Sequence, residues 1–178
     1  MFKLLHSRTG LHADDDRIQR SRWECDSSNS AELKSTLVVA CGNVLREDDA
    51  AGPWLAEHLD ELAIPGVDIL IVHQLQVELV EVFKDYDQII VVDASFTGSG
   101  VEWNRVEAPQ DPPNFATHHS SPQKLQSVFN QCYNRDLDLY VLTSRGESFG
   151  YREGFSPEMT QNLLEAYFFL VGFLLGRT

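Results

Sequence analysis

The chain has 178 residues, of which 43% are hydrophobic, and its 14 basic and 27 acidic residues give a formal net charge of −13. The length suits one domain, and the hydrophobic share is enough for a buried core. A chain this acidic, without a cluster of Lys or Arg, is a poor candidate for binding a nucleic-acid backbone.

The first 34 residues differ in composition from the rest of the chain. They are rich in Ser, Asp, Arg and Asn, hold six basic and six acidic residues, and show weak apolar periodicity. This composition predicts a mobile N-terminal extension over 1–34. The folded domain is then expected over 35–178, which carries the whole net charge.

Regular apolar patterns begin at residue 36. Short runs rich in β-branched residues predict strands, and apolar residues three and four apart predict helices. In chain order, the sequence predicts a strand over 36–41, a helix over 50–62, a strand over 67–72, a helix over 77–83, a strand over 88–93 and a more exposed strand over 101–106.

The second part of the chain continues this alternation. A Pro-rich loop over 108–120 is followed by Ser121-Pro122, where a capping serine and a proline predict the start of a helix. A strand over 139–143 follows, and Ser156-Pro157 predicts the start of the last helix. The alternation predicts a single α/β domain, with a mostly parallel twisted sheet and helices on both faces.

Cysteine usage and hydropathy bear on the cellular location. Cys25, Cys41 and Cys132 lie far apart and form no CxxC pair, which favours reduced thiols over a disulfide framework or a cysteine zinc site. Residues 1–20 lack the apolar run of a secretory signal. The apolar stretch 166–175 is well short of the roughly 20 residues that a membrane span needs. We therefore expect a cytoplasmic protein with no membrane contact.

Three places in the sequence could carry chemistry. The acidic turn 42–52 follows the first strand, Asp93 ends the third, and His118 and His119 precede a helix. In open parallel sheets, ligands bind beyond the carboxyl ends of the strands. Two carboxylates and an imidazole converging there would suit a divalent ion such as Ni²⁺, Zn²⁺ or Co²⁺. Each feature also has a purely structural interpretation, as a helix cap, a loop cap or a solvated histidine.

Two other classes of site are disfavoured. The turn after the first strand lacks the G-x-G-x-x-G pattern, and its carboxylates would repel a pyrophosphate, which argues against dinucleotide binding. No G-x-S-x-G motif is present, which argues against a serine hydrolase of the α/β-hydrolase type.

The turn carries a resemblance to a known family. Gly42-Asn43-x-Leu45-x-x-Asp48-Asp49-x-x-Gly52 resembles the signature of the [NiFe]-hydrogenase maturation endopeptidases, G-N-x-L-x-x-D-[DE]-G-x-G, with Ala50 in place of the usual glycine. Further segments resemble the same family in chain order: His73-Gln74-Leu75 (as in members that serve bidirectional, NAD-linked hydrogenases), Val91-Val92-Asp93-Ala94, His118-His119-Ser120-Ser121-Pro122, Gly146-Glu147-x-Phe149 and Gly154-x-Ser156-Pro157. The resemblance runs from Thr36 to the C-terminus.

The resemblance implies a function and a set of site residues. It implies an endopeptidase that removes the C-terminal tail of a hydrogenase large-subunit precursor after nickel insertion, with the nickel supplied by the substrate. Asp49 and Asp93 match the two acidic metal ligands, and His118 or His119 matches the third. Of the two histidines, His119 is favoured by its spacing to Pro122. The oligomeric state and the nucleophile are left open.

Two other functions fit the same residues. A non-catalytic chaperone of the immature large subunit would bind metal through the same trio without cutting. A general metallo-aminopeptidase would cleave unrelated peptides.

Overall fold

The computed structural model describes residues 3–5, 34–107 and 120–176. Within these ranges six strands form one sheet in the order β1-β3-β2-β4-β6-β5. The four central strands, which run parallel, are β3 (Val67–Val72), β2 (Thr36–Cys41), β4 (Gln88–Ser95) and β6 (Asp138–Arg145). The two edge strands, β1 (Lys3–Leu5) and β5 (Val101–Arg105), are antiparallel to their neighbours. The predicted α/β class with a mostly parallel sheet is confirmed.

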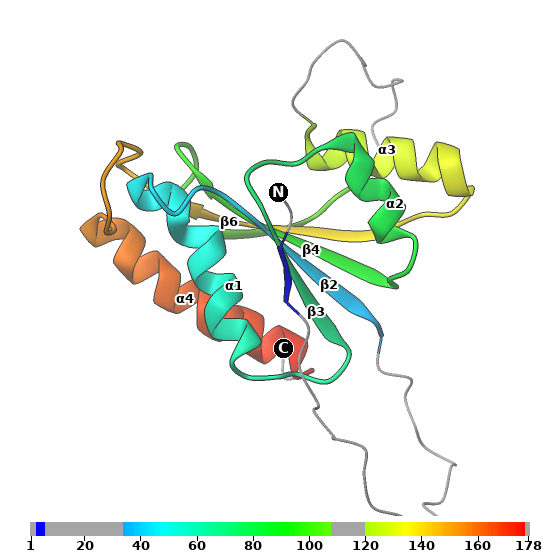
Figure 1. Cartoon of the computed structure of the whole chain (residues 1–178), viewed down its shortest axis with the longest axis horizontal. Helices are drawn as coiled ribbons and strands as arrows, with labels where there is room; N and C mark the ends of the chain where they lie inside the picture. The colour runs from blue at the N-terminus through cyan, green and yellow to red at the C-terminus, as the bar shows by residue number, and fades with distance from the viewer. Residues whose placement is uncertain (1–2, 6–33, 108–119, 177–178) are drawn as a thin grey trace, which may run out of the picture.

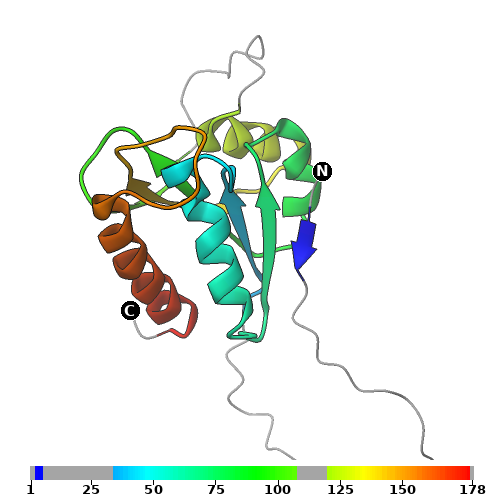
Figure 2. The same ribbon diagram turned by 60° about the vertical axis from the view of Figure 1, so that its left-hand side comes forward.

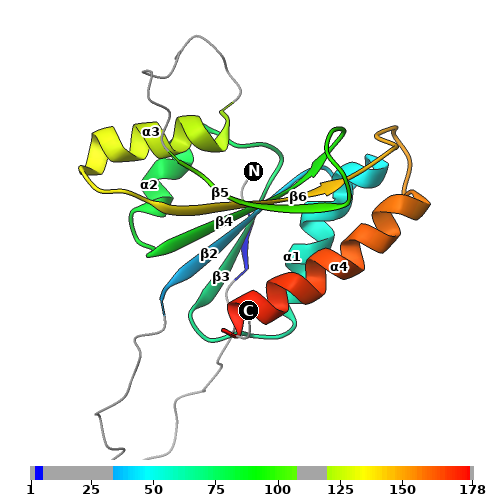
Figure 3. The same ribbon diagram turned by 180° about the vertical axis from the view of Figure 1, so that it is seen from behind.

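Helices cover both faces of the sheet (Figures 1 and 3). On one face lie α1 (Ala51–Asp60), which continues the short 3-10 helix η1 (Glu47–Ala50), and the long α4 (Pro157–Leu174). On the other lie α3 (Pro122–Tyr133) and a short pair, η2 (Val77–Leu79) with α2 (Val80–Phe83). Figure 2 shows α1 and α4 side by side, as their contacts also indicate.

The sheet separates two apolar cores. Leu37 and Val39 of β2 face the core under α2 and α3, whereas Val38 and Ala40 face the core under α1 and α4. All six residues of β2 are buried, because successive side chains point to opposite faces and both faces are covered. This is why the strand has a continuous apolar sequence rather than an alternating one.

The predicted helix starts at the two Ser-Pro pairs are confirmed. The hydroxyl of Ser121 accepts a hydrogen bond from the backbone N–H of Lys124, and that of Ser156 accepts one from Met159. Each serine satisfies a backbone donor that has no partner within its helix.

The N-terminal strand β1 is not predicted by the sequence. Its residues Lys3–Leu5 pair with β3, with Leu4 opposite Leu70. Three residues are too few to show the alternation that identifies a strand. The rest of the predicted extension, apart from Lys34, lies outside the described residues, so the boundary at residue 34 stays a prediction.

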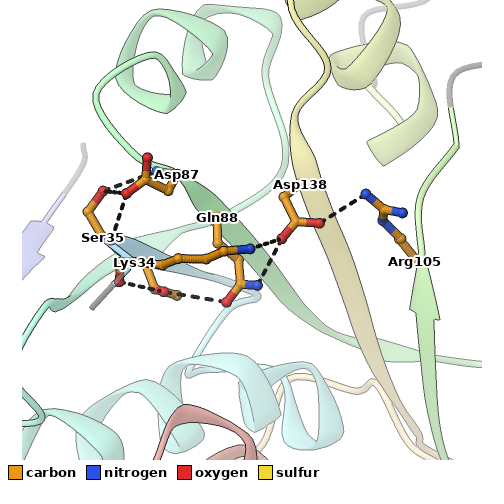
Figure 4. A network of polar contacts seen from close by, with 7 residues as sticks. Lys34, Ser35, Asp87, Gln88, Arg105 and Asp138 are labelled. Atoms are coloured by element: carbon orange, nitrogen blue, oxygen red, sulfur yellow. Dashed lines mark hydrogen bonds and ion pairs between the residues drawn. The ribbon is translucent and has the colours of Figure 1, made fainter. Parts of the chain in front are cut away.

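A polar network joins the strands at the end of the sheet opposite their carboxyl ends (Figure 4). Asp138 at the start of β6 pairs with Lys34 and with Arg105, both at 3.2 Å, and accepts a hydrogen bond from Gln88 Nε2. Asp87 accepts hydrogen bonds from the backbone and hydroxyl of Ser35. The network connects β2, β4, β6 and β5.

The helices within the described ranges fall short of what a bilayer crossing requires in length and apolar character. The cytoplasmic location stays a prediction.

Candidate active site

A cleft of about 910 Å³ lies at the carboxyl ends of the central strands. Cys41 at the end of β2, Asp93 two residues before the end of β4 and Asp49 in η1 all line it, as does His73, the residue after β3. The cleft therefore lies where the topology of an open parallel sheet places a ligand. Asp49 and Asp93, more than forty residues apart in sequence, are brought to the same cavity.

Asp49 is held by the turn that follows β2. One oxygen of its carboxylate accepts a hydrogen bond from the backbone N–H of Asn43 at 3.1 Å, and its carbonyl accepts another from the same group at 3.2 Å. Gly42 has φ of 137°, and a Cβ there would lie 1.9 Å from the Asp49 carbonyl oxygen. Only glycine lets the chain pass so close.

Two further positions of the turn explain the sequence motif. A Cβ at Gly52 would lie 2.1 Å from the carbonyl oxygen of Cys41, so glycine is needed where α1 crosses β2. Ala50, by contrast, has φ of −75° and ψ of −2°, which any residue adopts. The departure from the usual glycine therefore causes no backbone strain at this position.

Asp48, the first acid of the motif, has a structural role. Its side chain is fully buried and accepts hydrogen bonds from the backbone N–H groups of Glu147, Ser148 and Ser156, at 2.7–2.9 Å. Burial alone would raise the pKa of Asp48, but the hydrogen bonds from Ser156, Ser148 and Glu147 outweigh it and lower the pKa. Asp48 is thus a charged anchor for the segment between β6 and α4.

Arg46 and Glu47 hold the same segment. The carboxylate of Glu47 accepts hydrogen bonds from the Ser148 hydroxyl and the Gly150 N–H, and pairs with Arg152. The guanidinium of Arg46 donates to the carbonyl of Phe149 at 3.2 Å. We call residues 146–156 the clasped loop, because the three consecutive residues Arg46, Glu47 and Asp48 fix it beside the cleft.

Asp93 is the electrostatically unusual member of the site. Burial raises the pKa of Asp93 to about 6, and the neighbouring charge of Asp49 adds to the rise, against a hydrogen bond from the Ala94 N–H. Burial also raises the pKa of the Cys41 thiol, with Asp93 and Asp49 adding to the effect. Cys41 is therefore held in the protonated form, which is a poor nucleophile. The arrangement suits oxygen ligation of a cation by two carboxylates.

Solved structures of known proteins share this fold. The [NiFe] hydrogenase maturation protease HycI from Thermococcus kodakarensis KOD1 is similar, with a TM-score of 0.60 and 20% identity over 81% of this chain and 94% of that one. The hydrogenase maturating endopeptidase HybD from E. coli gives a TM-score of 0.58 and 21% identity over 79% and 92%. This chain has the fold of the hydrogenase maturation proteases.

A third maturation-protease structure agrees with these two. The hydrogenase 2 maturation peptidase from Thaumarchaeota archaeon SCGC_AB-539-E09 gives a TM-score of 0.58 and 20% identity over 82% of this chain and all of that one. No protein-family profile and no curated protein sequence matches the chain. At these identities the likeness establishes the fold alone.

His118 and His119, which the sequence predicts as the third metal ligand, lie outside the described residues. The next two residues, Ser120 and Ser121, line the cleft that holds Asp49 and Asp93. Over 3–5, 34–107 and 120–176, no group of three or more His, Cys, Asp or Glu side chains could hold a metal. The metal trio therefore stays a prediction, of which the structure brings two members to one cavity.

Sequence reasoning assigns no role to three residues that line the cleft. Arg46 occupies a variable position of the motif, and Phe96 follows Asp93 by three residues without any pattern around it. His73 lies in a segment matched to the family but carries no assigned function. For His73, one signal in the sequence was available. It directly follows a predicted strand, and the turn after the strand before it was already a candidate site.

Proposed function

We propose that the chain is an endopeptidase that removes the C-terminal tail of a [NiFe]-hydrogenase large-subunit precursor after nickel has been inserted. The observation that carries the proposal is that Asp49 and Asp93 line one cleft at the carboxyl ends of the strands. The fold supports it, because the structures that it resembles over more than three quarters of the chain are named maturation proteases or endopeptidases.

The two carboxylates would bind the nickel that the substrate brings. Asp49 is oriented by the Asn43 N–H through one oxygen, which leaves the other for a cation. His119, or His118 in its place, would supply a nitrogen ligand. Nickel held by these residues would supply Lewis-acid polarisation of a peptide carbonyl, and its remaining ligands from the precursor would fix the position of the bond to be cut.

Asp93 sets a pH requirement for this binding. A carboxyl group ligates a cation only when it is ionised. With a pKa of about 6, Asp93 is ionised above pH 7 and increasingly protonated below pH 6. The histidine must likewise be neutral to ligate, so acid weakens both interactions in the same direction.

The partner proposed is the large subunit of a bidirectional, NAD-linked hydrogenase. The support is the His73-Gln74-Leu75 segment, in which His73 and Gln74 are exposed and all three residues line the cleft. They are therefore placed to contact a substrate.

The experiment is an intact-mass measurement on the nickel-loaded precursor before and after incubation with the purified chain. Cleavage lowers the precursor mass by the mass of its C-terminal tail. A precursor that stays bound at unchanged mass would indicate the chaperone function instead, and trimming of unrelated peptides from their amino ends would indicate an aminopeptidase. In the same assay, His119→Ala is expected to stop cleavage and His118→Ala to slow it at most.

A further inference from the structure

Two aromatic side chains contact each other in the cleft. Phe96 follows β4, and Phe149 belongs to the clasped loop; their ring centroids are 3.7 Å apart with the planes inclined by 34°. Both side chains line the cavity that also holds Asp49 and Asp93. Phe96 is nevertheless 67% exposed. The pair therefore leaves apolar surface uncovered inside a cleft that also holds the charged side chains of Asp49, Asp93 and Arg46.

The position of Phe149 is fixed by its neighbours along the chain. Its carbonyl accepts the hydrogen bond from Arg46, while the residues before and after it, Ser148 and Gly150, donate backbone hydrogen bonds to Asp48 and Glu47. The packing is tight, since a Cβ at Gly146 would lie 2.9 Å from the tip of the Phe149 ring. Phe96 thus packs against a ring that is already held in place. Little conformational entropy is therefore lost when the pair binds a ligand.

We propose that Phe96 and Phe149 form an apolar subsite that holds an aliphatic or aromatic side chain of the precursor beside the bond to be cut. This inference rests on the proposed function. The rings offer no hydrogen bond, so they complement an apolar side chain and disfavour a charged one. Three residues of chain span at most about 10–11 Å. Because Phe96 is three residues after Asp93, their Cα atoms lie no farther apart than this, and both residues line one cleft.

The test compares variants of the exposed rings in cleavage of nickel-loaded precursor. Phe96→Ala removes the subsite surface, and Phe96→Leu restores an apolar side chain. Phe168→Ala is the matched control, because Phe168 is 69% exposed but lies on α4, away from the residues that line the cleft. Precursors in which each apolar residue within three positions of the cleavage point is replaced by Asp supply the substrate side of the comparison.

The expected result is a loss that depends on the substrate side chain. Phe96→Ala should lower kcat/KM roughly 10- to 100-fold, the range for losing one apolar contact in a specificity pocket. The loss should be mainly in KM, with most of it recovered in Phe96→Leu and none seen in Phe168→Ala. The parent should reject one Asp-substituted precursor by a similar factor, and Phe96→Ala should lose that discrimination.

Each contrary outcome identifies what has failed. If the parent cleaves no precursor, the proposed function fails. If the parent cleaves and Phe96→Ala matches it in rate and in preference, the subsite alone is overturned. A loss in Phe96→Ala with parental preference and no recovery in Phe96→Leu indicates a structural role and also overturns the subsite. So does a change of oligomeric state in Phe96→Ala at unchanged kcat/KM, which would assign the pair to self-association.

Discussion

Adjacent carboxylates in the turn after β2 have very different surroundings. Asp48 is fully buried, and its carboxylate accepts hydrogen bonds from three backbone N–H groups of the clasped loop. The carboxylate of Asp49 accepts one hydrogen bond, from the Asn43 N–H, and lines the cleft. A motif written as two acids in a row therefore combines an anchor with a candidate ligand. Because the two roles differ physically, they predict different consequences of substitution.

Replacing Asp48 by Ala is expected to destabilise the fold. The substitution leaves three backbone N–H groups of the clasped loop without their acceptor, which we expect to lower the free energy of unfolding by roughly 3 kcal/mol or more. Asp85→Ala, at an exposed position, is the control and should change it by less than about 0.5 kcal/mol. Urea unfolding measures both. Equal effects of the two substitutions would show that the hydrogen bonds from the clasped loop to Asp48 do not stabilise the domain.

Replacing Asp93 by Asn is expected to abolish processing while stabilising the protein at neutral pH. The folded-state pKa of about 6 exceeds the unfolded value of about 4, so folding favours the protonated form. The parent therefore loses stability as the pH rises from about 4 through 6, and Asn, which does not titrate, does not. Above pH 7 the variant should be more stable by about 1–3 kcal/mol.

The measurement is denaturant unfolding of the metal-free parent and Asp93→Asn at pH 4.5 and pH 7.5. The stability difference should be larger at pH 7.5. If it is the same at both values, the carboxyl of Asp93 is not perturbed in the folded protein. Normal cleavage of the precursor by Asp93→Asn would remove Asp93 from the ligand set.

At the level of the elements, the strands and helices around the site follow from local patterns. The buried strands β2 and β4 were predictable because both of their faces are covered, which makes their sequences continuously apolar. The starts of α3 and α4 were predictable because the signals, Ser121-Pro122 and Ser156-Pro157, are local. The same reasoning placed Asp93 at the end of its strand, and the structure extends that strand by two residues, to Ser95.

What could not be predicted depends on contacts distant in sequence. The partners of Asp48 lie 99 to 108 residues away, so the sequence cannot separate its role from that of Asp49. Phe96 meets Phe149 only because β4 and β6 are neighbours in the sheet and end at the same edge. Strand β1 forms by pairing with β3, and its three residues are too few to show a strand pattern in the sequence.

The edge strand β1 bears on how much of the N-terminal segment the domain needs. It pairs with β3 alone, whereas Asp49, Asp93 and the clasped loop depend on β2, β4 and β6. A chain beginning at Ser35 is therefore expected to fold and to process precursor at close to the full-length rate. Circular dichroism and the processing assay test this. An insoluble or inactive product would show that β1 is needed to cover the edge of β3.

At the scale of the whole molecule, the polar network and the two candidate ligands lie toward different ends of the sheet. The network around Asp138 joins the amino ends of the parallel strands (Figure 4), whereas Asp49 and Asp93 lie near the carboxyl ends, in a cleft that extends to Arg105. The net charge of −13 suits a protein that binds a cation held within its substrate rather than a polyanion. Two carboxylates and one imidazole would leave coordination positions open, and the large subunit can fill them.

The most direct test of this account compares nickel-loaded with nickel-free large-subunit precursor as substrates of the full-length chain at pH 7.5. Intact-mass spectrometry follows the loss of the C-terminal tail in each. Because the carboxylates are proposed to hold the peptide bond through the nickel, we predict cleavage of the nickel-loaded precursor and none of the nickel-free form over the same time. Equal cleavage of the two precursors would contradict the account.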